Sequence, residues 1–445
     1  TGTSAKMMMM ILRLSWLFTT PNTNRGNKPD NMCDKSVMMT MSQLRGHEPP
    51  LETGQVKMAE ALRFMEDCLI SAGATPEVAT QQAEMLIQAD RVGCTCHGMH
   101  KLEYYVNDIL HGSCTPNKKP TVVKETVSTA LVDGNNVLGA TASNFAMDLA
   151  IAKAKETGIG WVSVKGSNHN GRCGYWAKKA ADKAMIGMAF SNSAPFMVPT
   201  RGKEAALGTN PIAVVAPGSE GELFYLDMAT TAVAASKLEM QKRKGLPLPP
   251  GWALGPDGRG TMDAEALNTK CLMPLGGAEA TSGYKGYGLG AMVELFCGML
   301  SGSNYAHHVP QRTEEGGGPV ADLGQCFVAI DPEAFAPGFG KRLADCMQHW
   351  RQLSPAVPEH PVLSPGDLEK DFAAKVDNRG TFVYIKNQIE SCAALAERLK
   401  VPPMVVVMDK VAEATYAVIE DATDSRTDIA HPDEAIEDKG PVRKL

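Results

Sequence analysis

Four short phrases that combine glycines with polar side chains constrain this chain more than any other feature. They are, in chain order, CTCHGMHKL from Cys94, GSNHNG from Gly166, FYLDMATT from Phe224 and GYKGYGLG from Gly283. Glycines permit tight turns and a close approach of the backbone to a ligand. Two histidines, an aspartate and a lysine lie within these phrases. The arrangement predicts an enzyme that holds a small substrate and a cofactor.

Composition and charge describe an ordinary globular chain and exclude two classes of partner. Its 445 residues are 44% hydrophobic and 21% charged, enough to build a sizeable core over about three domains. With 44 basic against 50 acidic side chains and a net charge of -6, no basic surface for nucleic acid is expected. We also expect no membrane partner, because no apolar run is long enough to span a bilayer.

The two ends of the chain and its cysteines bear on where the protein works. Residues 1–54 are expected to be an extension; they carry basic residues and no acid before Asp30, which is typical of a mitochondrial presequence. The alternative, which we favour, is a flexible extension. Residues 401–445 form a second extension, apolar at its start and charged at its end. Eleven cysteines without a CxxC pair indicate reduced thiols and a cytoplasmic location, with a mitochondrial one as the alternative.

Between these ends the hydrophobic pattern predicts three regions. Residues 55–125 are expected to be helical from their first residue, with residues 365–400 returning to them. Residues 126–335 are expected to form an α/β domain, in which the strands WVSVK, IGMAF, IAVVA, LFYLD and CFVAID alternate with helices. An irregular stretch is expected over residues 337–365, and a last helix over residues 385–399.

The phrase CTCHGMHKL has two interpretations. Cys94, Cys96, His97 and His100 offer metal-ligand side chains, but zinc sites usually draw ligands from two separated segments, and no second CxxC or HxxxH is present. We therefore expect no metal. A histidine before a glycine at a helix end is better suited to proton transfer, since histidine gains and loses a proton near neutral pH. Lys101, about one helical turn further on, would hold a substrate carboxylate.

The other three phrases each combine a functional reading with a structural one. His169 follows the strand WVSVK, where α/β proteins place ligand groups, but it also fits a solvated Asn/Gly turn. Asp227 would orient a histidine or cap a helix. Lys285 at a helix start would meet a phosphate or carboxylate, although the glycines around it do not fit GxGxxG. Without GxSxG, HExxH or P-loop motifs, oxidoreduction is the favoured chemistry.

Taken together, these phrases resemble the malate/L-lactate dehydrogenase family that is unrelated to Rossmann-type lactate and malate dehydrogenases. The family's DSHGxxRL is matched by residues 95–102, its SxHFG by residues 167–171 and its GTNP by residues 208–211. Its LDMATS and GYKGYGL are nearly intact. The resemblance extends over residues 55–401.

The resemblance implies a fold, a reaction and an assembly. It implies a non-Rossmann α/β fold with a helical N-terminal part on the substrate side and a central α/β domain that binds the cofactor. The implied reaction transfers hydride between NAD or NADP and a small 2-oxo acid or cyclic imino acid, with malate and lactate as examples. The implied assembly is a homodimer, with the terminal extensions available to protein partners.

The resemblance also assigns roles to particular residues. His97 is expected to act as general acid/base, with His169 as the alternative and otherwise a polar group near the carbonyl; Asp227 orients His97. The other matched positions are Cys96 for catalysis, Lys101, Thr209 and Asn210 for substrate, and Ser193, Asp227, Met228, Ala229, Lys285 and Gly286 for cofactor.

Four positions depart from the family pattern. Thr95, Cys96 and Lys101 replace the family's Asp, Ser and Arg, and Asn170 replaces an aromatic residue. Lysine lacks the bidentate fork of arginine, so weaker carboxylate binding is expected. The alternative is therefore a member with little or no activity that serves as a structural or binding component of a larger assembly.

Overall fold

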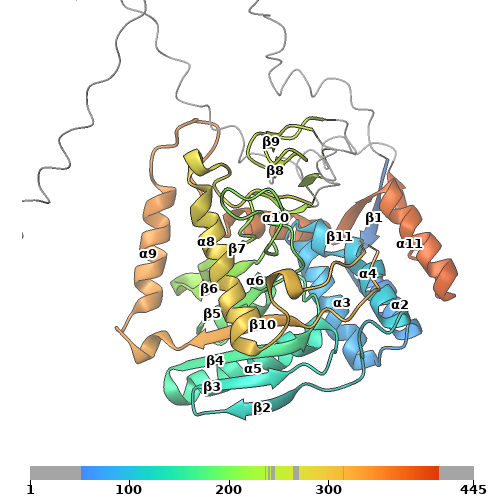
Figure 1. The fold of residues 1–445 in the computed structure, drawn as a ribbon, viewed down its shortest axis with the longest axis horizontal. Coiled ribbons are helices and arrows are strands. Elements are labelled where there is room, and N and C mark those ends of the chain that lie inside the picture. Colours follow the sequence, from blue (N-terminus) through green and yellow to red (C-terminus); the bar gives the residue numbers. More distant parts are fainter. Residues whose placement is uncertain are drawn as a thin grey trace, which may run out of the picture. The chain divides into compact units, whose positions relative to one another are not determined.

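The computed structural model describes residues 52–235, 237–238, 241, 246–263, 270–313 and 315–409 (Figure 1). Most of both predicted extensions, residues 1–51 and 410–445, lies outside these ranges. Among the described residues, no helix is long and apolar enough to cross a membrane.

A sheet of seven strands in the order β2-β3-β4-β10-β5-β6-β7 forms the centre of the fold. Only β3 and β4 pair in parallel; the other neighbours are antiparallel. The five strands predicted between residues 159 and 331 are confirmed. The bounds are β2 Thr121–Glu125, β3 Thr129–Asp133, β4 Ile159–Ser167, β5 Ile186–Ser191, β6 Ile212–Pro217, β7 Leu223–Met228 and β10 Leu323–Ile330.

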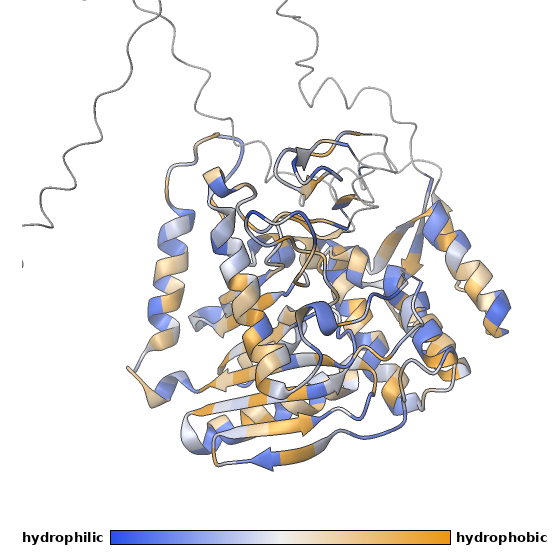
Figure 2. Ribbon diagram, viewed as in Figure 1, coloured by the Kyte–Doolittle hydropathy of each residue, from blue (hydrophilic) through white to orange (hydrophobic). Residues whose placement is uncertain are grey.

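Helices cover both faces of this sheet. On one face, α5 (Gly139–Thr157) and α6 (Cys173–Ala181) share a core with Phe327 and Ala329 of β10. On the other, Cys326 and Val328 of β10 pack with α8 (Gly283–Glu294) and the π-helical turn η7 (Leu295–Met299) that continues it. The alternation along β10 follows from the period of two in a strand. Figure 2 shows hydrophobic segments along the strands of this sheet and a hydrophilic end on the edge strand β2.

A smaller sheet joins segments from far apart in the chain. β1 (Thr53–Lys57) pairs in antiparallel fashion with β11 (Thr381–Ile385) and with β12 (Val407–Asp409) (Figure 1). Helices pack around it: α2 (Met58–Ser71), α3 (Pro76–Arg91), α4 (Leu102–Leu110), α10 (Asp367–Arg379) and α11 (Lys386–Leu399). Residues from these helices and from α5 and α6 form one continuous core.

Two local expectations were wrong, and the predicted last helix is confirmed as Lys386–Leu399, with Ile385 in β11. The first helix begins at Met58 because the preceding residues pair as β1. Neither strand alternates clearly in sequence; each is stabilised by its distant partner. The stretch over residues 337–365 contains a helix, α9 (Phe339–Arg351), of which only Met347 is buried. Phe339, Leu343, Met347 and Trp350 recur at helical spacing in this stretch, a periodic signal that the expectation of irregular structure overlooked.

The remaining elements are short. They are β8 Ala253–Leu254, β9 Gly260–Thr261, and the 3-10 turns η2 Thr95–His97, η3 Met99–Lys101, η4 Ser219–Gly221, η6 Glu279–Thr281, η8 Ala306–His308 and η9 Pro332–Ala334. Two of them, η2 and η3, carry the first of the four phrases.

Candidate active site

The turn that presents His97 is fixed by a buried carboxyl group. Asp90, near the end of α3, is 3% exposed and accepts hydrogen bonds from the Met99 backbone N–H (2.9 Å) and the Tyr384 hydroxyl (2.8 Å). A Cβ atom on Gly98 would lie 1.9 Å from the Asp90 carboxylate, so only glycine fits there. This is why the phrase needs glycine directly after His97.

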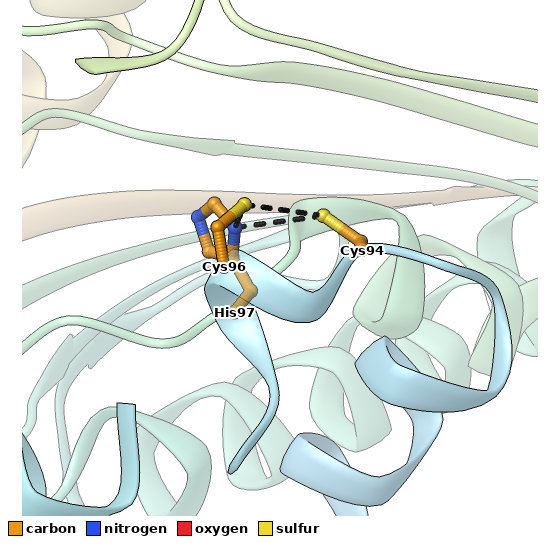
Figure 3. A group of neighbouring side chains, drawn as sticks. All are labelled: Cys94, Cys96 and His97. Carbon is orange, nitrogen blue, oxygen red and sulfur yellow. Dashed lines mark hydrogen bonds between the residues drawn. The ribbon is translucent and has the colours of Figure 1, made fainter. Parts of the chain in front are cut away.

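Three metal-ligand side chains converge on this turn (Figure 3). The His97 Nδ1 atom lies 3.1 Å from Cys96 Sγ and 3.5 Å from Cys94 Sγ, and the two sulfur atoms are 3.8 Å apart. His100, the fourth residue considered in the sequence, turns elsewhere, with its Nδ1 3.4 Å from Gln388 Oε1. Cys96 thus contacts the imidazole directly, as a residue beside a catalytic group would.

The structure brings the two candidate histidines together from different parts of the chain. The His97 and His169 rings stack with centroids 5.7 Å apart and an interplanar angle of 19°. The Tyr105 hydroxyl lies 2.6 Å from His169 Nδ1, and the Gly171 N–H donates to the same nitrogen at 3.4 Å. Because a backbone N–H can only donate, Nδ1 is an acceptor, and the neutral ring carries its proton on Nε2.

His169 is held in its neutral form. Burial holds the pKa of His169 well below its usual range, and the nearby His97 imidazole, Lys101 and Arg312 lower that pKa further. His169 is therefore a hydrogen-bond donor through Nε2 at neutral pH, the role of a polar group beside a carbonyl oxygen.

Two cations share one aromatic ring beside the histidines. Lys101 Nζ and Arg312 Cζ each lie 5.3 Å from the centroid of Tyr104, and that ring lies 6.0 Å from the His169 ring. Arg312 forms a buried ion pair with Asp108, and its Nη1 is buried with no hydrogen-bond partner among the described residues. A buried donor without a partner costs stability unless a ligand supplies an acceptor. The group is suited to a carboxylate.

Sequence reasoning missed Arg312 because its loop carries none of the four phrases. The signal that could have found this loop is the run of glycines that follows, residues 316–318, all with positive φ. A Cβ on Gly316 would lie 2.2 Å from the Tyr104 carbonyl oxygen, and Gly317 N–H donates to Asp108. These glycines let the loop lie directly against α4.

Asp227 is placed differently from the expectation. It lies within β7 rather than before a helix, and its Oδ2 is 3.1 Å from Arg172 Nε in a buried ion pair. Arg172 also lies 5.7 Å from the Tyr225 ring. The Arg172 guanidinium is thus a charged neighbour of the carboxylate, while Asp227 Oδ2 has no hydrogen-bond partner among the described residues. The orientation of His97 by Asp227 stays a prediction.

Two predicted substrate residues hold the backbone. Asn210 is fully buried and donates from Nδ2 to the Gly290 carbonyl (2.9 Å) and to Glu294 Oε2 (2.8 Å), so it helps to position α8. Its Oδ1 is buried and has no hydrogen-bond partner among the described residues, so the predicted contact with substrate stays a prediction. Thr209 donates its N–H to Ser193 Oγ at 3.1 Å. This bond places Ser193, a predicted cofactor residue, beside Thr209.

The other predicted cofactor residues gather where α8 begins. A Cβ on Gly286 would lie 2.3 Å from the Leu275 carbonyl, so α8 approaches that segment closely. The Leu275 N–H donates to Thr230, which follows residues 228–229 at the end of β7. Lys285 is exposed in the first turn of α8. The side chain of Lys285 is thus available to a ligand at this edge.

Comparisons with known proteins show which family the chain is similar to. The sequence model described as malate/L-lactate dehydrogenase matches residues 56–389. The malate dehydrogenase of Pyrococcus abyssi is 42% identical over 280 residues, 62% of this chain and 76% of that protein. The L-sulfolactate dehydrogenase of Methanocaldococcus jannaschii is 34% identical over 312 residues, 69% and 87% of the two chains. The solved malate dehydrogenase of Entamoeba histolytica has a TM-score of 0.74 at 30% identity, covering 79% of this chain and 99% of that one.

The buried carboxyl under the turn gives a prediction on stability. Burial raises the pKa of Asp90 from 3.8 to about 7. Between these values the folded protein holds a proton that the unfolded chain has lost. The contribution of protonated Asp90 to the free energy of unfolding is therefore complete below pH 3.8, and it disappears as the pH rises through 7.

Asp90→Asn removes this titration. Between pH 5 and pH 8, the wild type should lose about 2 to 3 kcal/mol of unfolding free energy relative to the variant. Urea unfolding at several pH values measures this difference. Asp345→Asn, at an exposed position of α9, should leave the pH dependence unchanged. Parallel profiles for wild type and Asp90→Asn would contradict the raised pKa.

Proposed function

The chain belongs to the malate/L-lactate dehydrogenase family, and from that premise we propose that it transfers hydride between a nicotinamide cofactor and a small 2-hydroxy or 2-oxo acid. The observation that carries the proposal is the placement of His97 and His169 beside Lys101 and Arg312. A 2-oxo acid presents a carbonyl next to a carboxylate, which calls for a proton carrier, a hydrogen-bond donor and a cation. These four side chains supply all three.

The residues at the start of α8 fit NAD or NADP. Lys285 offers an exposed ammonium at the positive end of a helix dipole, which suits a phosphate group. Ser193, paired with Thr209, and residues 227–229 at the end of β7 complete the proposed cofactor side. When bound, the cofactor supplies or accepts the hydride.

The proton is handled by the two histidines in different ways. Hydride added to the carbonyl carbon must be matched by a proton added to its oxygen. His97 is proposed to give this proton in reduction and to take it back in oxidation. His169, neutral with its proton on Nε2, donates a hydrogen bond to the same oxygen and stabilises the charge that develops there.

The carboxylate is held by Arg312 together with Lys101. Lys101 alone offers a point charge, whereas the unpartnered Nη1 of Arg312 supplies a guanidinium donor in place of the family's arginine. Two cations on one ring suit a substrate with one or two carboxylates, such as malate or lactate. Binding of the carboxylate also offsets the positive charges that lower the pKa of His169.

The alternative of a structural component without activity gains no support. The relatives with the matched motifs are named as dehydrogenases. The site keeps His97, His169 and Lys101 close to one another, although Thr95 and Cys96 differ from the family pattern. We therefore keep catalysis as the function.

The proposed reaction is tested by the oxidation of NADH and NADPH with oxaloacetate, pyruvate and cyclic imino acids as substrates. The wild type should turn over at least one of them with one of the two cofactors. His97→Ala should lower kcat about 100-fold to 10,000-fold, because the proton carrier is lost. Full activity in His97→Ala would move proton transfer to His169, and an inactive wild type would contradict the proposed function.

Arg312→Lys tests the proposed carboxylate site. Lysine keeps one charged partner for Asp108 but removes the free Nη1 donor, which at about 1.5 to 3 kcal/mol predicts a rise in KM of roughly 10-fold to 100-fold. The matched control is Arg351→Lys, since Arg351 forms ion pairs with Asp367 and Glu222. Equal KM values for wild type and Arg312→Lys would show that Arg312 does not bind the substrate.

We also propose that the protein is a homodimer. Large apolar side chains of α8, of η7 and of the residue that follows η7 are exposed by 36% to 55%: Leu289, Leu295, Met299 and Leu300. A cluster of this kind marks an interaction surface, and in a dimer it would be shared by both copies. Sedimentation should show a dimer that Leu295→Glu with Met299→Glu converts to a monomer. The matched control Val122→Glu with Val123→Glu, exposed on β2, should remain dimeric. A wild-type monomer would contradict the proposal.

A further inference from the structure

The turn that carries His97 has the donor set of a metal site, and the proposed reaction uses only His97 of that set. Cys94 Sγ, Cys96 Sγ and His97 Nδ1 all lie within 4.8 Å of one another. We propose that these three side chains bind a thiophilic divalent metal ion, Zn²⁺, beside the proposed substrate site.

The distances between the donors match the edges of a zinc coordination tetrahedron. With Zn–S bonds of about 2.3 Å and Zn–N bonds of about 2.0 to 2.1 Å, tetrahedral angles place two sulfurs about 3.8 Å apart and a sulfur and a nitrogen about 3.5 Å apart. The Cys94 and Cys96 sulfurs are 3.8 Å apart, and Cys94 Sγ lies 3.5 Å from His97 Nδ1. The third edge, from Cys96 Sγ to His97 Nδ1, is 3.1 Å. A small rotation of one side chain would bring it to the ideal length.

The donors are arranged in advance because they share one short turn. The His97 N–H donates to the Cys94 carbonyl at 2.9 Å, and the Asp90 carboxyl fixes the residues that follow. Figure 3 shows the three side chains directed toward one another from this turn. A site assembled before the ion arrives avoids the ordering cost of collecting its ligands.

Three protein ligands are enough for such a site. Zinc sites with two cysteines and one histidine keep their fourth position for water or another small ligand. The chain has no second CxxC or HxxxH, but a second pair of ligands is a requirement of closed structural zinc sites and not of open ones. The half-buried positions of Cys94, Cys96 and His97 are consistent with an open fourth position.

The consequence for catalysis rests on the proposed function. Coordination replaces the thiol protons with the metal and occupies Nδ1 of His97. The imidazole is then fixed as a ligand and is not available as the proton carrier. Zn²⁺ bound here should inhibit hydride transfer, and a chelator should restore it.

Metal binding is tested first, without reference to activity. The full-length protein, reduced and freed of metal, is dialysed against Zn²⁺ and against Co²⁺, whose thiolate charge-transfer absorption reports sulfur ligands. One ion per chain is expected. Cys94→Ser and Cys96→Ser should each weaken binding by about tenfold or more, since even residues that only support metal ligands affect affinity by that much. The matched control is Cys346→Ser, at an exposed position of α9, which should bind as the wild type does.

The outcomes separate this site from the proposed function. Absence of stoichiometric binding to the folded wild type overturns the site, as does binding that survives both cysteine variants, for example at His307 and His308. Thermal unfolding of each variant shows whether a loss of binding reflects the ligand or the fold. Turnover that persists with the site filled would leave the metal site standing and contradict proton transfer by His97. Activity in a protein that binds no Zn²⁺ would overturn the site and leave the proposed function intact.

Discussion

The buried carboxyl of Asp90 is the interaction on which the site depends. It joins α3, the backbone at Met99 and the hydroxyl of Tyr384 in β11, and so links the N-terminal helices to a strand almost 300 residues further along the chain. Because the turn between α3 and α4 is fixed by these bonds, the positions of Cys94, Cys96 and His97 follow from them. The same turn brings His97 against His169, which arrives on the loop after β4.

Electrostatics then gives the two imidazoles different characters. His169 is surrounded by positive groups and burial, and it accepts a hydrogen bond at Nδ1, so it is neutral with its proton on Nε2. His97 instead has two sulfur atoms beside Nδ1. His169 is thus suited to donate a hydrogen bond. The thiols beside His97 can keep their protons or, as thiolates, bind a metal ion together with its Nδ1. The cations at Tyr104 are proposed to orient the substrate through its carboxylate.

Local patterns in the sequence predict much of this arrangement. The strands of the α/β region alternate or are continuously apolar, and the glycines at the turns mark where polar side chains lie. These patterns point to His97, His169 and Lys101, which the structure brings close to one another. Contacts between distant segments leave no such pattern. β1 and β11 are stabilised by pairing with each other, and Arg312 contacts Tyr104 from a loop 208 residues away. Arg172 likewise forms an ion pair with Asp227. The sequence motif also gives no sign that Nδ2 of Asn210 donates hydrogen bonds to α8.

The central claim is that this site moves a hydride to the carbonyl carbon of a 2-oxo acid while its histidines handle the proton. The most direct measurement is mass spectrometry of the product formed from a 2-oxo acid and a nicotinamide cofactor deuterated at the transferred position, with the reaction run in ordinary water. The account predicts one deuterium on C2 of the hydroxy acid and none on its oxygen. A product without deuterium would contradict hydride transfer to the 2-oxo acid. The absence of product with both deuterated NADH and deuterated NADPH would also contradict it.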